Sequence, residues 1–163
     1  MPRGPHENQS SSVAGVGSYC TSGWHYGHWR GPFYPQDLPT AKMLRWYAQH
    51  FDTVEINNSF YRLPTNEALA GWCRETPLKF CFAVKASRFI THHRKLKDSE
   101  QSSQKFFAQI TRLGQRLGPI LFQLPPGWKL NRERLEEFLA TLPKRRRCVF
   151  EFRNPTWNVS CGV

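Results

Sequence analysis

The 163-residue sequence lacks the segments that would place it in or across a membrane. No apolar run approaches the roughly 18 residues that a membrane span needs, so no membrane partner is expected. The N-terminus has no apolar core of a secretory signal, which makes the cytoplasm the expected location. The length fits one domain that can bury a substantial core.

The cysteines show no Cys-x-x-Cys pair, and their number is odd. They are Cys20, Cys73, Cys81, Cys148 and Cys161. Three of them fall in segments with the composition of strands, where free cysteine behaves as a small hydrophobe. The spacing therefore favours reduced, mostly buried thiols over a disulfide framework or a zinc site.

Several catalytic motifs are also absent. The sequence has no Gly-x-Ser-x-Gly elbow and no His-Glu-x-x-His pair, and residues 114–118 end a helix rather than form a phosphate loop. Carboxylates could join His25, His28, His92 or His93 in an oxygen and nitrogen metal site. No metal site is predicted, because His25 and His28 lie in a loop without ligand spacing. No cofactor can be named.

Acidic residues are scarce: 12 Asp and Glu stand against 23 Lys and Arg, a net charge of +11. The excess lies in residues 85–147, which hold 15 basic and 5 acidic side chains. The densest run is Lys-Arg-Arg-Arg at residues 144–147. Such a run favours nucleic acid or anionic ligands by counterion release. A solvated turn is the other interpretation, and the more common one.

Residues 21–35 form a loop rich in aromatic side chains, glycine and proline. Its large rings do not follow the spacing of a helix or a strand. Aromatic rings with polar groups often form the floor of a ligand pocket. The alternative is a loop that caps a core with its own rings, and this stretch alone does not separate the two.

The rest of the chain alternates between strand and helix patterns. Strands are predicted at residues 17–22, 53–57, 80–86, 119–124 and 148–152, and helices at 40–51, 65–75, 103–116 and 131–141. Thr40 and Asn131 are the expected N-caps, and Thr65 opens the second helix. Residues 1–16 have the composition of a disordered tail, and residues 88–103 form the longest predicted loop. The order predicts an α/β fold with a parallel sheet and right-handed crossovers.

The nearly continuous apolar run at residues 80–86 indicates strands buried on both faces. Polar residues nevertheless occur at the end of every predicted strand, and parallel strands bring these ends to one edge. Glu55 and Glu151 each interrupt an apolar run, where a carboxylate must be paired or functional. They could act as acid and base on a glycosidic bond, or form ion pairs with Lys85 or Arg153.

Five blocks resemble one known family. They include Thr-Ser-Gly-Trp-His-Tyr at residues 21–26 and Val-Glu-Ile-Asn-Asn-Ser-Phe-Tyr-Arg-Leu-Pro at 54–64. The next block is Phe-Ala-Val-Lys-Ala-Ser-Arg-Phe-Ile-Thr-His at 82–92. The last two, in the same order, are Leu-Gly-Pro-Ile-Leu-Phe-Gln-Leu-Pro-Pro at 117–126 and Glu-Phe-Arg-Asn-Pro-Thr-Trp at 151–157. Together they resemble the YecE-like family, a domain of unknown function.

The resemblance implies a fold similar to a TIM barrel, of which residues 17–157 would form the N-terminal part. A complete barrel typically needs ~250 residues, and residues 158–163 diverge from the family pattern. The expected fold is therefore a partial (β/α) barrel, truncated after about the fifth strand. The expected catalytic residues are Glu55, Lys85 and Glu151. The expected ligand-binding residues are Trp24, Tyr26, Trp29, Tyr34, Asn57, Tyr61, His92, Gln123, Arg153 and Trp157.

Three functions remain open from the sequence. The first is an enzyme, with hydrolase-like acid/base chemistry, that acts on a small polar or anionic ligand such as a sugar or phosphorylated metabolite. The second is a nucleic-acid-binding module that uses residues 85–147. The third is a catalytically silent interaction protein. The oligomeric state is not predicted.

Overall fold

A computed structural model describes residues 21–158, which form an α/β fold around one parallel sheet. The four strands pair in the order β1-β2-β3-β4, and each pairing is parallel. Their bounds are Thr53–Ile56 (β1), Cys81–Lys85 (β2), Leu117–Gln123 (β3) and Cys148–Glu151 (β4). These strands confirm the last four that the sequence predicts. Of the strand predicted at residues 17–22, residues 17–20 lie outside the described part of the chain, as do the tails at 1–16 and 159–163.

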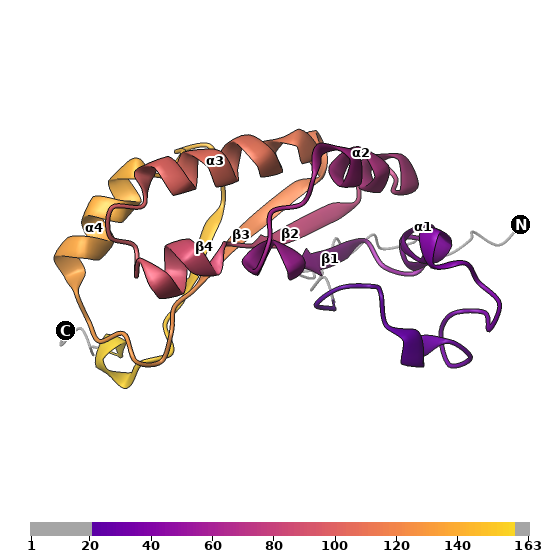
Figure 1. Ribbon diagram of the computed structural model, residues 1–163, viewed down its shortest axis with the longest axis horizontal. Helices are drawn as coiled ribbons and strands as arrows, with labels where there is room; N and C mark the ends of the chain where they lie inside the picture. Colours follow the sequence, from indigo (N-terminus) through magenta and orange to yellow (C-terminus); the bar gives the residue numbers. More distant parts are fainter. Residues whose placement is uncertain (1–20, 159–163) are drawn as a thin grey trace, which may run out of the picture.

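Helices connect the strands and cover one side of the sheet. They are α1 (Met43–Tyr47), α2 (Asn66–Glu75), α3 (Glu100–Ile110) and α4 (Arg132–Thr141). In Figure 1, α2, α3 and α4 form an arc along one side of the strands, and α1 lies near β1. The side chains of Thr65 and Asn131 accept hydrogen bonds from the amides of Ala68 and Arg134, which confirms both as N-caps.

Two helix predictions were partly wrong. The helix predicted at residues 40–51 is a 3₁₀ turn at Thr40–Lys42 followed by the short α1, and Thr40 makes no capping bond. The loop predicted at residues 88–103 contains a π-helix at Phe89–His93, and α3 begins within it at Glu100. Helix α3 ends earlier than predicted, and a 3₁₀ segment follows in which Gly114 takes a left-handed conformation, with φ of 59°.

The sheet has one buried face and one partly exposed face. Side chains alternate between faces along each strand, and Phe82, Val84 and Phe122 are buried on the helix side. Their neighbours Ala83 and Lys85 are only half-buried. The prediction of strands buried on both faces was therefore wrong for residues 21–158. The free cysteines Cys73, Cys81 and Cys148 are likewise half-buried rather than fully buried.

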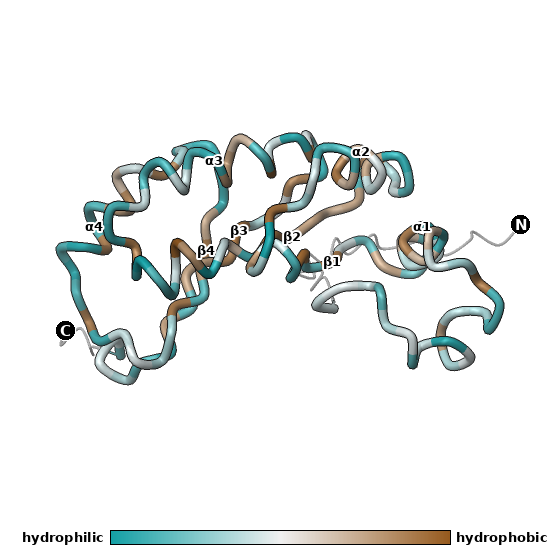
Figure 2. The backbone as a smooth tube through the Cα atoms, in the orientation of Figure 1, coloured by the Kyte–Doolittle hydropathy of each residue, from teal (hydrophilic) through white to brown (hydrophobic). Residues whose placement is uncertain are grey.

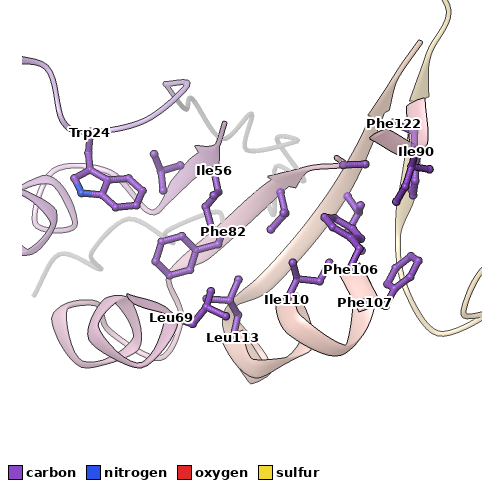
Figure 3. Packing of buried hydrophobic residues seen from close by; sticks show 14 of the residues in the cluster. Trp24, Ile56, Leu69, Phe82, Ile90, Phe106, Phe107, Ile110, Leu113 and Phe122 are labelled. Carbon is purple, nitrogen blue, oxygen red and sulfur yellow. The ribbon is translucent and has the colours of Figure 1, made fainter. Parts of the chain in front are cut away.

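The core lies between the sheet and the helices. Figure 3 shows Phe82 beside Leu69 and Leu113, with Phe106 and Ile110 of α3 further along the same layer. The hydropathy colours in Figure 2 follow this division, because hydrophobic positions gather on β2 and β3 while the helices mix both kinds. Trp24 joins this core from the aromatic loop, with its ring 6.3 Å from that of Phe82.

The aromatic loop folds largely onto itself. Tyr34 has no exposed surface, and its hydroxyl donates a 2.7 Å hydrogen bond to the carbonyl oxygen of Trp24. Burial, followed by the charge of Tyr47, raises the pKa of Tyr34 to about 12. Trp29 is half-buried between Tyr26 and Phe33, with ring centroids at 4.7 and 5.7 Å. For Trp29 and Tyr34 the structure favours the interpretation of a loop that caps the core, because their rings pack against other rings of the loop and the core.

Gly118 gives a direct test of how closely β2 and β3 pack. A Cβ atom added there would lie 2.3 Å from Cys81 Sγ and 3.1 Å from the carbonyl oxygen of Phe82. We expect Gly118→Ala to lower the free energy of unfolding by about 1–3 kcal/mol, through overpacking. Gly127→Ala is the control, because no atom lies within 4 Å of its added Cβ. Chemical denaturation measures both, and equal stabilities would contradict this packing.

Tyr34 gives a test of the folded aromatic loop. Tyr34→Phe leaves the Trp24 carbonyl unpaired, so we expect a loss of about 1–2 kcal/mol of unfolding free energy at pH 7. Because the pKa of Tyr34 rises from 10.0 to about 12, its contribution is complete below pH 10 and is lost as the pH rises towards about 12. The difference between wild type and variant should therefore shrink in this range. Tyr61→Phe, at an exposed position, is the control.

Candidate functional site

Four polar strand-end residues lie on the partly exposed face of the sheet. The register pairs Glu55 with Ala83, Lys85 with Leu121, and Gln123 with Glu151. Paired residues of parallel strands share a face, and so do residues two apart on one strand. Glu55, Lys85, Gln123 and Glu151 therefore point to the face opposite the helices. They occupy the C-terminal ends of the four strands.

Glu151 is held by two partners at the end of β4. Its carboxylate accepts a 2.8 Å hydrogen bond from Gln123 Nε2 and lies 3.7 Å from Arg153 Nε. The side chains of Glu151 and Arg153 keep 44% and 47% of their surface exposed, so solvent weakens this ion pair. The ion-pair interpretation thus applies to Glu151 and Arg153, which nevertheless remain accessible to a ligand.

Glu55 has a different environment at the end of β1. Its carboxylate accepts one long hydrogen bond, 3.3 Å, from Ser22 Oγ. It lines a cavity of about 110 Å³ together with His25, Tyr26 and Asn57, and the indole rings of Trp24 and Trp72 form part of its wall. The two indole rings meet edge to face at 5.3 Å. Burial lowers the pKa of His25, so this cavity favours the neutral imidazole.

Basic side chains gather near the end of β2. Lys85 Nζ and the ring of His92 each lie 5.0 Å from the ring centroid of Phe60. The pKa of His92 is lowered first by burial and then by the positive charges of Arg88, Lys85, Arg153 and His93. Lys85 ends β2 and Arg153 follows β4, so the charges that act on His92 come from the C-terminal ends of two strands. His92 Nδ1 lies 2.9 Å from Thr91 Oγ1.

The other expected ligand residues divide between the site and its surroundings. Tyr61 is 70% exposed, and the guanidinium carbon of Arg88 lies 5.9 Å from its ring centroid. Trp157 stacks on Phe152 at 4.3 Å and donates a 3.0 Å hydrogen bond from Nε1 to the Trp128 carbonyl, so it stabilises the loops after β3 and β4. Trp29 and Tyr34 belong to the folded aromatic loop and contribute no free surface to the cavity.

Sequence reasoning missed two side chains at this site. Phe60 lies in the 3₁₀ turn Asn58–Phe60 directly after β1, and its ring contacts both Lys85 and His92. Trp72 lies in α2 and lines the Glu55 cavity. The signal for Phe60 was its place in a block that follows a strand end. No sequence signal distinguished Trp72 from an ordinary core residue.

Residues 21–158 lack two features that would indicate a particular kind of site. No group of three or more His, Cys, Asp or Glu side chains is arranged to hold a metal ion. No helix in the same range has both the length and the apolar character needed to cross a bilayer.

Comparison with known proteins gives consistent matches. The family model described as Protein of unknown function DUF72 matches residues 18–161. The UPF0759 protein YunF of Bacillus subtilis (strain 168) is 29% identical over 136 residues, which are 76% of this chain and 47% of that protein. The UPF0759 protein YecE of Escherichia coli (strain K12) is 31% identical over 113 residues, covering 69% and 42%. The chain thus spans less than half the length of these curated relatives.

Solved structures agree with the family match. A DUF72 family protein from Thermotoga maritima MSB8 aligns with a TM-score of 0.74 at 32% identity, covering 87% of this chain and 58% of that one. Another, from Enterococcus faecalis V583, aligns with a TM-score of 0.66 at 19% identity, over 86% and 53%, and supports the fold alone. DUF72 proteins fold as TIM-like barrels, whereas the sheet of residues 21–158 does not close. The resemblance seen in the sequence is confirmed, and the chain belongs to the DUF72 family.

Proposed function

We propose that the C-terminal ends of the strands bind and process a small polar ligand, a sugar or a phosphorylated metabolite. The supporting observation is that Glu55 and Glu151 share one face of the sheet but have different surroundings. Enzymes separate the roles of two carboxylates by giving them unlike environments. In this proposal the chemistry is acid/base catalysis of the hydrolytic kind.

The partners of each carboxylate suggest its role. Glu151 accepts a hydrogen bond from the amide of Gln123 and lies beside the guanidinium of Arg153, and in this proposal it serves as the base. Glu55 has only the long bond from Ser22 and lies against the indole walls of the cavity. In this proposal Glu55 serves as the acid. Lys85 lies on β2, one of the two strands between them, and would bind negative charge on the ligand.

The cavity beside Glu55 limits what can enter it. Its volume of about 110 Å³ is below the roughly 300–1,000 Å³ of pockets that enclose a whole metabolite. Only a part of the ligand, such as one edge of a sugar ring, would therefore lie beside Glu55, against the wall that Trp24 and Trp72 form together. The remainder would lie over the half-exposed side chains of β2, β3 and β4. Aromatic walls suit the apolar face of a sugar ring.

The other two functions stay predictions. The basic run at residues 144–147 precedes β4, so it lies at the opposite end of the sheet from Glu151. It therefore does not add to the charge around Lys85, and no contact within residues 21–158 favours nucleic acid over a small ligand. A catalytically silent interaction protein and a cytoplasmic location likewise stay predictions.

The carboxylates provide the test of this proposal. The chain and a full-length relative are first screened by thermal shift against neutral and phosphorylated sugars. For a ligand that raises the Tm of this chain, we expect Glu55→Gln and Glu151→Gln each to slow its conversion by about 10²–10⁴-fold, because each removes an acid or base. Product formation is followed by NMR.

Glu136→Gln, on the exposed surface of α4, is the matched control and should convert the ligand at the wild-type rate. Wild-type rates in both Glu55→Gln and Glu151→Gln would exclude these carboxylates as acid and base. Failure of every sugar and sugar phosphate to raise the Tm of either protein would contradict the proposed ligand class.

A further inference from the structure

Lys85 is a half-buried cation without an acidic partner among the described residues. The three ion pairs between side chains of residues 21–158 join Arg45 to Glu75, Lys79 to Asp52, and Arg153 to Glu151. The contact that the Lys85 ammonium does make is with the ring of Phe60, at 5.0 Å. Removing an ammonium from water without a counter-charge is unfavourable, so this position suits an external anion.

Further positive charge surrounds the same point. Arg88, Lys85 and Arg153 all act on His92, and each of the charged groups that shift its pKa is basic. The carboxylate of Glu151 offsets Arg153 only in part, because both are about half exposed and 3.7 Å apart. Like charges brought together repel one another, and a bound anion removes that repulsion.

The chemistry of these groups favours phosphate. Lys85 offers a compact point charge, while Arg88 and Arg153 offer planar donor pairs that match phosphate oxygens. We propose that Lys85, Arg88, His92 and Arg153 form a subsite for the phosphate group of a small phosphorylated metabolite. This inference rests on the proposed function and narrows its ligand to the phosphorylated class. The non-phosphate part of the ligand would extend from Lys85 along the sheet face towards Glu55.

Aromatic rings fix the positions of the basic groups before any ligand binds. The ring of Phe60 meets that of His92 edge to face. The Lys85 ammonium lies over the ring of Phe60 at 5.0 Å, and the Arg88 guanidinium lies over the ring of Tyr61 at 5.9 Å. Such cation–π contacts are worth about 0.5–1 kcal/mol at exposed sites, enough to restrict long side chains. Less side-chain freedom is then lost when the anion binds, which increases affinity.

The backbone around His92 has features common at functional sites. His92 lies in the π-helix Phe89–His93, and such one-turn π segments are frequent at binding and catalytic positions. Shortly after it, Lys95, Leu96 and Asp98 take left-handed conformations with φ of 49°, 66° and 44°. Conformations of this kind cost on the order of 1–3 kcal/mol each in residues other than glycine.

A small phosphate ester fits this subsite better than a nucleic-acid backbone. Glu55 and Glu151 lie on the same sheet face as Lys85 and would repel a polyanion that extends beyond the subsite. The densest basic run, residues 144–147, precedes β4 at the other end of the strands, so it forms no continuous track with Lys85. A single phosphate group needs only the local cluster.

The test compares the two lysines at opposite ends of β2. Binding of ribose 5-phosphate, ribose and inorganic phosphate is measured by calorimetry for wild type, Lys85→Met and Lys79→Met. We expect Lys85→Met to weaken binding of ribose 5-phosphate and phosphate by roughly 10–100-fold and to leave ribose unaffected, because it removes a charge-assisted hydrogen bond. Lys79→Met should bind all three like wild type, since Lys79 pairs with Asp52 at the far end.

Two further variants, Lys85→Arg and Arg88→Gln, keep the test valid if Lys85→Met fails to fold. Lys85→Arg keeps the charge and should retain affinity within a few-fold, whereas Arg88→Gln, at an exposed position, should weaken phosphate binding with an unchanged Tm. Equal binding of ribose 5-phosphate and ribose by wild type would overturn the phosphate subsite and leave the proposed function intact. Binding of neither, together with the failure of every other sugar and sugar phosphate to raise the Tm, would overturn both.

A short oligonucleotide is included at low and moderate salt. Nucleic acid would be the ligand, instead of a metabolite, if wild type bound the oligonucleotide more tightly than ribose 5-phosphate. That binding would also have to be lost in Lys85→Met and to fall steeply between about 50 and 200 mM salt. Binding of ribose 5-phosphate that changes much less over the same range supports the subsite.

Discussion

Parallel pairing of β1 to β4 is the constraint on which the site depends. When neighbouring strands run the same way, their C-terminal ends lie at one edge, and the pairing register decides which side chains face the same direction. A shift by one residue would turn Glu55, Lys85 and Glu151 towards the helices and expose Val54, Val84 and Phe150 instead. The apolar layer under α2, α3 and α4 resists such a shift, so the core that stabilises the fold also orients the polar residues.

The two faces of the sheet therefore have different physical roles. On the helix side, Phe82, Val84 and Phe122 lose nearly all contact with water, and each contributes about 1.5–3 kcal/mol through burial. On the other side, Lys85 and Glu151 remain half-buried with few partners, a condition that adds little stability. The sheet can hold such polar groups because the apolar face on the helix side provides the stability of the fold. That asymmetry is typical of sites that bind ligands at strand ends.

The sequence predicted the features that follow from local chemistry. The apolar runs located β1 to β4, and the side-chain oxygens of Thr65 and Asn131 marked two helix starts. The position of Glu55 between Val54 and Ile56 also identified a carboxylate at a strand end. These patterns are readable because strand alternation and N-capping involve residues close together in the chain.

The features that the sequence did not predict depend on distant contacts. Tyr34 was expected in the ligand pocket, but its hydroxyl is bonded to the Trp24 carbonyl and its ring is enclosed by the folded loop. The π-helix at Phe89–His93 lies in a polar stretch that is indistinguishable from a loop in composition. Phe60 became relevant only when the turn after β1 brought its ring into contact with Lys85 and His92.

The meeting of β2, β4 and the π-helix at one point can be measured without a ligand. The imidazole of His92 is titrated by NMR in wild type, Lys85→Met, Arg153→Met and Lys79→Met. Because the positive charges of Lys85 and Arg153 lower the pKa of His92, removing either should raise that pKa, while Lys79→Met should leave it unchanged. An unchanged pKa of His92 in both Lys85→Met and Arg153→Met would show that these strand ends do not converge.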